Sequence, residues 1–131
     1  MDRETALVDF ANDAFYAAFN SGDKEGMAAL WAGSVPVTCI HPGWPPTIGR
    51  DDVVESWNNI LGAAENRVMH HTIDVFRQGE VYSVLCYEEL PGGWLIATNN
   101  FVIEGGEAKI IHHQAGPCQS PDALPDREAP Q

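Results

Sequence analysis

The chain has 131 residues, of which 44% are hydrophobic and 20% are charged, a composition typical of one globular domain with its own core. Seven Lys and Arg residues against nineteen Asp and Glu residues give a formal net charge of −12, which argues against nucleic acid and membrane partners. Cys39, Cys86 and Cys118 have no CxxC spacing, so neither a disulfide framework nor a zinc ribbon is indicated. With no targeting or membrane segment apparent, we expect a cytoplasmic protein.

Three helices are expected in the first half of the chain. Apolar residues recur at intervals of three and four over residues 4–20, which is the period of an amphipathic helix. Ser21, Gly22 and Asp23 then provide a stop and a new N-cap for a short helix over residues 24–31. A third helix is expected to begin with Asp51 as its N-cap, before an apolar stripe that ends at Gly62.

Strand patterns dominate the rest of the chain. Residues 34–41 are rich in β-branched side chains, and Pro36 among them favours an edge strand, while the prolines that follow predict a rigid loop. Four further runs separated by glycine turns predict an antiparallel meander. They cover residues 67–77, 81–90, 94–104 and 108–115. The domain is therefore expected over residues 1–117, with a proline-rich tail over residues 118–131.

Together these elements predict an α+β fold in which three N-terminal helices pack on a strongly curved antiparallel sheet. The strand at residues 94–104 carries apolar side chains on both faces, with Leu95 and Phe101 on one and Trp94 and Ile96 on the other. A strand that is buried on both faces needs a second covering layer. We therefore expect a homodimer that forms through the sheet face.

Several short motifs resemble a known family. They are Cys39-Ile40-His41-Pro42-Gly43-Trp44, Gly49-Arg50 with Ser56-Trp57, Ala97-Thr98-Asn99-Asn100-Phe101, and His112-His113-Gln114-Ala115-Gly116-Pro117. This succession is similar to the SnoaL-like branch of the nuclear transport factor 2-like (NTF2-like) superfamily, and its end also resembles the association domain of calcium/calmodulin-dependent kinase II. The resemblance implies a cystatin-like cone, often dimeric, with a cavity between the helices and the concave sheet. The superfamily includes isomerase-like, dehydratase and cyclase enzymes beside many members without known activity, so the fold does not decide the function.

Three residues are candidates for acid and base chemistry in such a cavity. His112 alternates with Ile110 and is the first candidate for a general base, and Glu88, which alternates with Cys86, is the second. Asp74 is the third candidate, as a lone acid on the preceding predicted strand. The structural alternatives are a histidine bonded to the backbone for His112 and a strand-end carboxylate in water for Glu88.

Further side chains are expected to contact a ligand. Neighbouring strand residues face opposite sides, so only one histidine of each His-His pair can enter the cavity. The expected contacts are His41, Trp44, Trp57, His70, Thr98, Asn100 and Gln114. The sequence contains no P-loop, GxGxxG or HExxH motif and no clustered ligand set, so we expect neither a cofactor nor a metal ion.

Two functions fit these patterns. The preferred hypothesis is a protein that binds a small, partly apolar molecule in a conical pocket, because the polar candidates do not form a recognisable catalytic set. The alternative is a cofactor-free enzyme of the cyclase, isomerase or dehydratase type, which would use a pocket histidine with Glu88 or Asp74 as acid and base. A dimerisation module with an incidental cavity is a third, weaker possibility.

Overall fold

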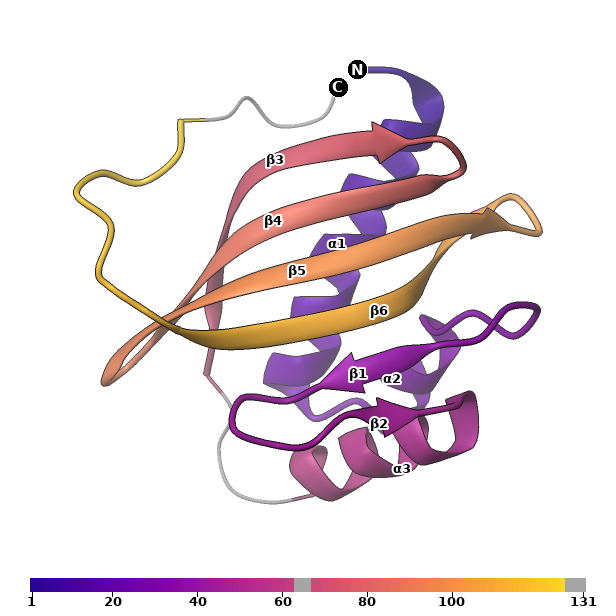
Figure 1. Cartoon of the computed structure of the whole chain (residues 1–131), viewed down its shortest axis with the longest axis horizontal. Coiled ribbons are helices and arrows are strands. Elements are labelled where there is room, and N and C mark those ends of the chain that lie inside the picture. Colours follow the sequence, from indigo (N-terminus) through magenta and orange to yellow (C-terminus); the bar gives the residue numbers. More distant parts are fainter. Residues whose placement is uncertain (63–66, 127–131) are drawn as a thin grey trace.

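The computed structural model describes residues 1–62 and 67–126, and it has the α+β architecture that the sequence predicts (Figure 1). The helices are α1 (Arg3–Ser21), α2 (Lys24–Ala29) and α3 (Arg50–Leu61). The strands are β1 (Thr38–Ile40), β2 (Thr47–Ile48), β3 (Met69–Gln78), β4 (Val81–Leu90), β5 (Gly93–Glu104) and β6 (Glu107–Cys118). They form one sheet in the order β2-β1-β6-β5-β4-β3, which curves around α1 (Figure 1).

The helix ends follow local chemistry. The Asp2 side chain accepts a hydrogen bond from the Thr5 N–H at the start of α1, and Gly22 ends the helix in the left-handed conformation, with φ +68°. Helix α2 ends before Trp31, which was predicted to be helical and instead pairs with Ile110 of β6 in an isolated bridge. Helix α3 is capped by Gly49, two residues before the expected N-cap, so the prediction of Asp51 as N-cap is wrong.

The long strands confirm the predicted meander, whereas the first strand is much shorter than predicted. Of residues 34–41, only 38–40 form a strand, since Pro36 has no N–H to donate to a ladder. This strand joins the sheet by pairing in parallel with β6, with Thr38 opposite His112. Strand β6 extends to Cys118, one residue past the expected domain boundary, and residues 119–126 contain no helix or strand. The end of the predicted tail, 127–131, lies outside the described residues.

Two β-bulges interrupt the long strands. The pairing of β3 with β4 jumps from Thr72 to Asp74, which leaves Ile73 as an extra residue. The pairing of β5 with β6 runs from His112 to Ile110 on the β6 side, so Ile111 is also extra. Each extra residue reverses the alternation of side chains, so residues on its two sides with the same parity face opposite sides of the sheet.

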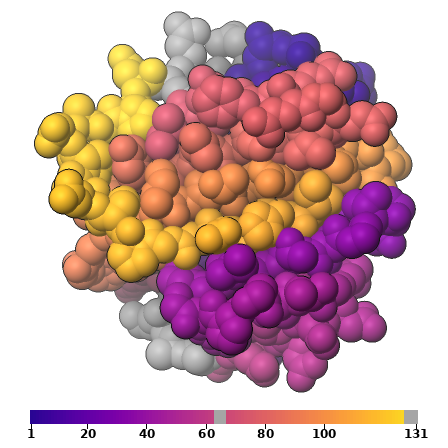
Figure 2. Space-filling view, in the orientation of Figure 1, coloured from indigo at the N-terminus to yellow at the C-terminus, as the bar shows by residue number. Residues whose placement is uncertain are grey.

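The two faces of the sheet are covered differently. Helices α1 and α3 lie on the concave side (Figure 1), where the core gathers Phe15, Met27, Trp57, Tyr82 and Phe101. The convex face is formed by the strands themselves, and none of the described helices lies over it (Figure 2). In residues 1–62 and 67–126, no helix is both long and apolar enough to cross a lipid bilayer. The cavity described below lies on the concave side of the sheet, next to α1 and α3.

Candidate functional site

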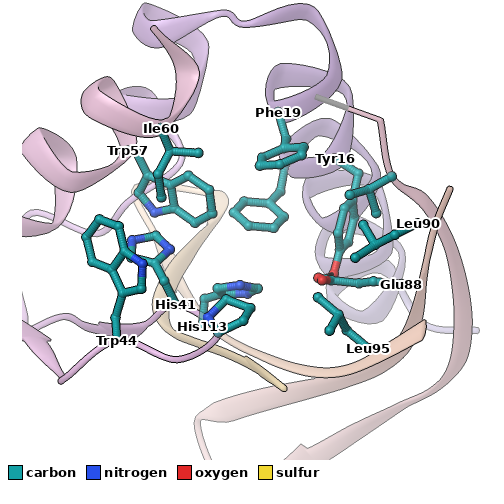
Figure 3. A pocket seen from close by; sticks show the side chains of 13 residues that line it. Tyr16, Phe19, His41, Trp44, Trp57, Ile60, Glu88, Leu90, Leu95 and His113 are labelled. Carbon is teal, nitrogen blue, oxygen red and sulfur yellow. Dashed lines mark hydrogen bonds between the residues drawn. The ribbon is translucent and has the colours of Figure 1, made fainter. Parts of the chain in front are cut away.

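A cavity of about 250 Å³ lies between α1, α3 and the concave face of the sheet. Helix α1 and the strands contribute opposite walls, and α3 closes one side (Figure 3). Most of the lining is aromatic or aliphatic, and it comes from Phe15, Tyr16, Phe19, His41, Pro42, Trp44, Trp57, Ile60, Val68, Glu88, Leu90, Leu95 and His113. None of these lining residues is a lysine or an arginine, so the wall offers no cation to an anionic ligand.

A directed chain of hydrogen bonds runs behind the cavity wall. The Asn99 side-chain amide donates from Nδ2 to Asn12 Oδ1 at 2.8 Å and to Tyr16 Oη at 3.1 Å. Its Oδ1 is therefore the acceptor for His113 Nδ1, at 2.5 Å. Because the His113 proton is placed on Nδ1, its other ring nitrogen, Nε2, carries a lone pair on the cavity side.

Glu88 ends this chain. Tyr16 Oη donates to Glu88 Oε2 at 2.6 Å, and both side chains are almost fully buried, at 2% and 5% exposed. Burial raises the pKa of Glu88, an effect that the Tyr16 hydrogen bond partly offsets. Burial and the neighbouring Glu88 carboxylate raise the pKa of Tyr16 well above its usual range. The carboxyl group thus stays on the cavity wall and favours its neutral form more than an exposed glutamate does (Figure 3).

His41 occupies the opposite side of the cavity, where β1 ends. The Ser56 hydroxyl on α3 donates to the Val53 carbonyl at 2.7 Å, so Ser56 Oγ accepts from His41 Nε2 at 2.9 Å. The imidazole packs edge-on against both Trp44 and Trp57, with ring centroids 4.8 and 4.6 Å away. Burial lowers the pKa of His41 to about 4, so this ring is neutral near pH 7.

His113 is neutral for the same reason. It is 3% exposed, and burial, reinforced by the nearby His41 and His112, lowers its pKa to about 3. Neither histidine on the wall therefore supplies positive charge near neutral pH. The cavity suits a neutral molecule better than a carboxylate or phosphate, because it has no charge to offset the desolvation of an anion.

The structure places four of the predicted site residues on the cavity wall, namely His41, Trp44, Trp57 and Glu88. His112 is not among the lining residues, and its Nδ1 instead lies 2.6 Å from Thr38 Oγ1. The expectation that His112 faces the cavity is wrong because the bulge at Ile111 reverses the alternation that starts at Ile110. Its neighbour His113 lies there instead.

Asp74 is displaced by the other bulge. The extra residue Ile73 turns the Asp74 side chain to the exposed side, where its Oδ1 accepts the N–H of Val75 at 2.8 Å, so the expected place of Asp74 in the site is also wrong. His70 lies behind the cavity wall: its ring stacks on Tyr16 at 4.4 Å, and its Nε2 contacts Asp13 Oδ1 at 2.7 Å.

The three remaining predicted contacts lie outside this cavity. Thr98 is paired with Gln114, and Asn100 is paired with His112. Thr98 and Asn100 alternate with the buried Asn99 and therefore lie on the convex side of the sheet. Gln114, which is paired with Thr98, lies on the same side.

Four polar residues of the hydrogen-bond chain were not among the predicted site residues: Asn12, Tyr16, Asn99 and His113. Asn12 and Tyr16 are one helical turn apart within the apolar stripe of α1, and Asn99 alternates with apolar residues of β5. Polar side chains at positions that the pattern assigns to the core need buried partners, and this is the signal that could have found them. In residues 1–62 and 67–126, no group of three His, Cys, Asp or Glu side chains could hold a metal ion.

The family model of the SnoaL-like domain matches residues 8–118. The chain belongs to the SnoaL-like domain family. This confirms the resemblance seen in the motifs. This SnoaL-like chain is also similar in structure to a candidate dehydratase of the NTF2-like family from Streptomyces avermitilis. The TM-score is 0.79 and the identity 28%, and the match covers 89% of this chain and 97% of that chain.

Two further relatives extend the comparison. A candidate calcium/calmodulin-dependent protein kinase type II association domain from Thiobacillus denitrificans has TM-score 0.76 and 31% identity, covering 85% of the SnoaL-like chain and 94% of its own. Other solved structures that match are described as having a cystatin-like fold, which confirms the expected fold class. F-box protein SKIP8 from Arabidopsis thaliana is 24% identical over 114 residues, and the SnoaL-like chain spans about half of its length, 49%.

Proposed function

We propose that this SnoaL-like protein binds a small, neutral, partly apolar molecule in its conical cavity. The observation that carries the proposal is the combination of apolar walls with two buried polar groups, His113 and Glu88, on the same cavity. A ligand that replaces water against these apolar walls gains packing contacts with them. The polar groups then fix the orientation of the ligand.

The size and charge of the cavity limit the ligand. A volume of about 250 Å³ is below the roughly 300–1,000 Å³ of pockets for drug-sized molecules, which points to a ligand of about one or two rings. The neutral histidines and the lack of a lining lysine or arginine disfavour carboxylates and phosphates. The aromatic rings of Phe15, Trp44 and Trp57 favour a flat molecule.

Calorimetric titration with 2-fluoronaphthalene, a neutral two-ring probe, tests this proposal. We expect one probe to bind per chain. Leu95→Trp fills the cavity from β5 and should abolish binding, whereas Ile48→Trp places the same indole at an exposed position on β2 and should leave it unchanged. The proposal fails if neither 2-fluoronaphthalene nor its hydroxyl analogue 2-naphthol binds, or if Leu95→Trp binds the probe as well as the natural protein does.

The alternative function, acid and base catalysis without a cofactor, is favoured by one observation. The carboxyl of Glu88 faces the same cavity as the free nitrogen of His113, and its pKa is raised by burial toward the range in which a carboxylate is an effective base. Glu88 would remove a proton from an apolar substrate while Tyr16, hydrogen-bonded to it, holds the carboxyl in place.

This alternative can be tested with 5-nitrobenzisoxazole, a small neutral compound. When a base removes its C3 proton, the C–H electron pair forms a nitrile, the N–O bond breaks and a phenolate leaves. We expect the protein to accelerate this opening with a rate that rises as Glu88 ionises, and Glu88→Gln to lose about 100-fold of that acceleration. Equal rates for the protein and Glu88→Gln would reject the catalytic alternative and leave the binding proposal intact.

We also propose that the protein forms a homodimer through the convex face of the sheet. Apolar side chains remain partly exposed there, among them Phe76 at 44% and Ile96 at 37%, beside Trp94 and Tyr87. Light scattering on the natural protein should give the mass of two chains. Trp94→Glu should give one chain, and Phe10→Glu, on the exposed side of α1, should still give two.

A further inference from the structure

The buried side chains of His113 and Glu88 form the inner end of the cavity. The hydrogen-bond donors and acceptors at this end indicate what kind of group a ligand presents there. His113 is only 3% exposed, and its Nδ1 donates a hydrogen bond to Asn99 Oδ1. Within residues 1–62 and 67–126, its Nε2 has no hydrogen-bond partner and is not one of the fully buried unpaired atoms, and His113 lines the cavity. A buried acceptor on a cavity wall needs a donor, and only a ligand or water in the cavity can supply one.

Apart from the O–H of a neutral Glu88 carboxyl, the side-chain donors near this end of the cavity are already used. Tyr16 gives its only proton to Glu88, and its oxygen accepts from Asn99. His41 gives its Nε2 proton to Ser56. The His113 side of the inner wall therefore offers an acceptor, and the donors of Tyr16 and His41 are used internally.

Tryptophan does not change this polarity. The Trp57 Nε1 atom is buried away from the cavity space, so it cannot reach a ligand without a rearrangement. Trp44 lies at the mouth, where its side chain is 46% exposed and water competes for its N–H. The two indoles thus shape the walls without supplying a donor at the inner end.

We propose that the ligand carries a neutral hydroxyl group, as an alcohol or a phenol, which donates to His113 Nε2 while its apolar body fills the aromatic cavity. This inference rests on the proposed binding function and narrows it to one chemical class. An ether, a ketone or a halide has no proton to give and would leave Nε2 both desolvated and unpaired.

Two probes of nearly the same shape test the proposal. Calorimetry on the full chain near neutral pH compares 2-naphthol, which carries the donor, with 2-fluoronaphthalene, in which fluorine replaces the hydroxyl. We expect 2-naphthol to bind about 3- to 10-fold more tightly, which is the worth of one buried hydrogen bond. His113→Phe should bind both probes equally, whereas His112→Gln, on the other face of β6, should keep the preference.

A measurement on the natural protein removes the dependence on variant folding. In ¹⁵N spectra of histidine-labelled protein, His113 Nε2 should appear as an unprotonated nitrogen that shifts upfield when 2-naphthol is added and much less with 2-fluoronaphthalene. Equal affinity for the two probes, or a preference that survives in His113→Phe, would overturn the hydroxyl assignment and leave the binding proposal standing. If neither probe binds, the proposed function itself fails.

Discussion

His113 should make the stability of the protein sensitive to acid. Burial lowers its pKa from 6.5 to about 3 in the folded protein, so between these values the unfolded chain binds more protons than the folded one. The free energy of unfolding must therefore fall as the pH falls through this window. At about pH 5, one and a half units below the unfolded pKa at about 1.36 kcal/mol per unit, His113 alone costs about 2 kcal/mol of stability.

Replacement of His113 by Phe isolates this contribution. The variant keeps the other titrating groups. The lowered pKa of His41 also reduces the stability as the pH falls, whereas the raised pKa of Glu88 increases it. Urea unfolding followed by circular dichroism, at a series of pH values from about 7.5 to about 5, gives the loss of stability for each protein. His113→Phe should lose about 2 kcal/mol less than the natural protein over this range. Parallel losses in the natural protein and His113→Phe would refute the reasoning.

Two other substitutions test separate parts of the structure. Tyr16→Phe leaves buried polar atoms of Glu88 and Asn99 without their partner, so it should cost about 1–3 kcal/mol in urea unfolding. Tyr16→Phe should also raise the pKa of Glu88 further, because the hydrogen bond that is lost holds this pKa down. Carboxyl ¹³C titration measures the pKa of Glu88, and a lower value in the variant would contradict this assignment. Gly22→Ala forces an alanine into the left-handed conformation at the end of α1 and should cost about 1–2 kcal/mol. Gly92→Ala, with open space and no positive φ, is the control, and an equal loss there would contradict the explanation.

The sequence predicts most of the fold because the patterns of its long elements are local. The 3.6-residue period over residues 4–20 locates α1 to within one residue at each end, and the glycine turns separate the long strands. Strand β1 is different: it is three residues long and held by pairing with β6, a contact between distant parts of the chain. No local pattern specifies such a contact.

The site was predicted less well than the fold, and for His112 and Asp74 the reason lies in two bulged residues. Alternation along a strand assumes that every residue is paired, but Ile73 and Ile111 are bulged. Nothing in their side chains distinguishes a bulged isoleucine from a paired one, so parity counted from Ile110 selects His112 instead of His113. Glu88 lies on β4, which pairs regularly with β5 from Tyr82 to Leu90, and for that residue the parity argument gave the correct side.

A crystal soaked with 4-bromophenol tests the central claim most directly, because bromine gives an anomalous signal that fixes the orientation of the probe. The bromine should lie between the aromatic walls near Trp44 and Trp57, and the phenol oxygen should lie within about 2.7–3.0 Å of His113 Nε2. A bromine peak outside the cavity, or a phenol oxygen turned toward the mouth and away from His113, would contradict the claim.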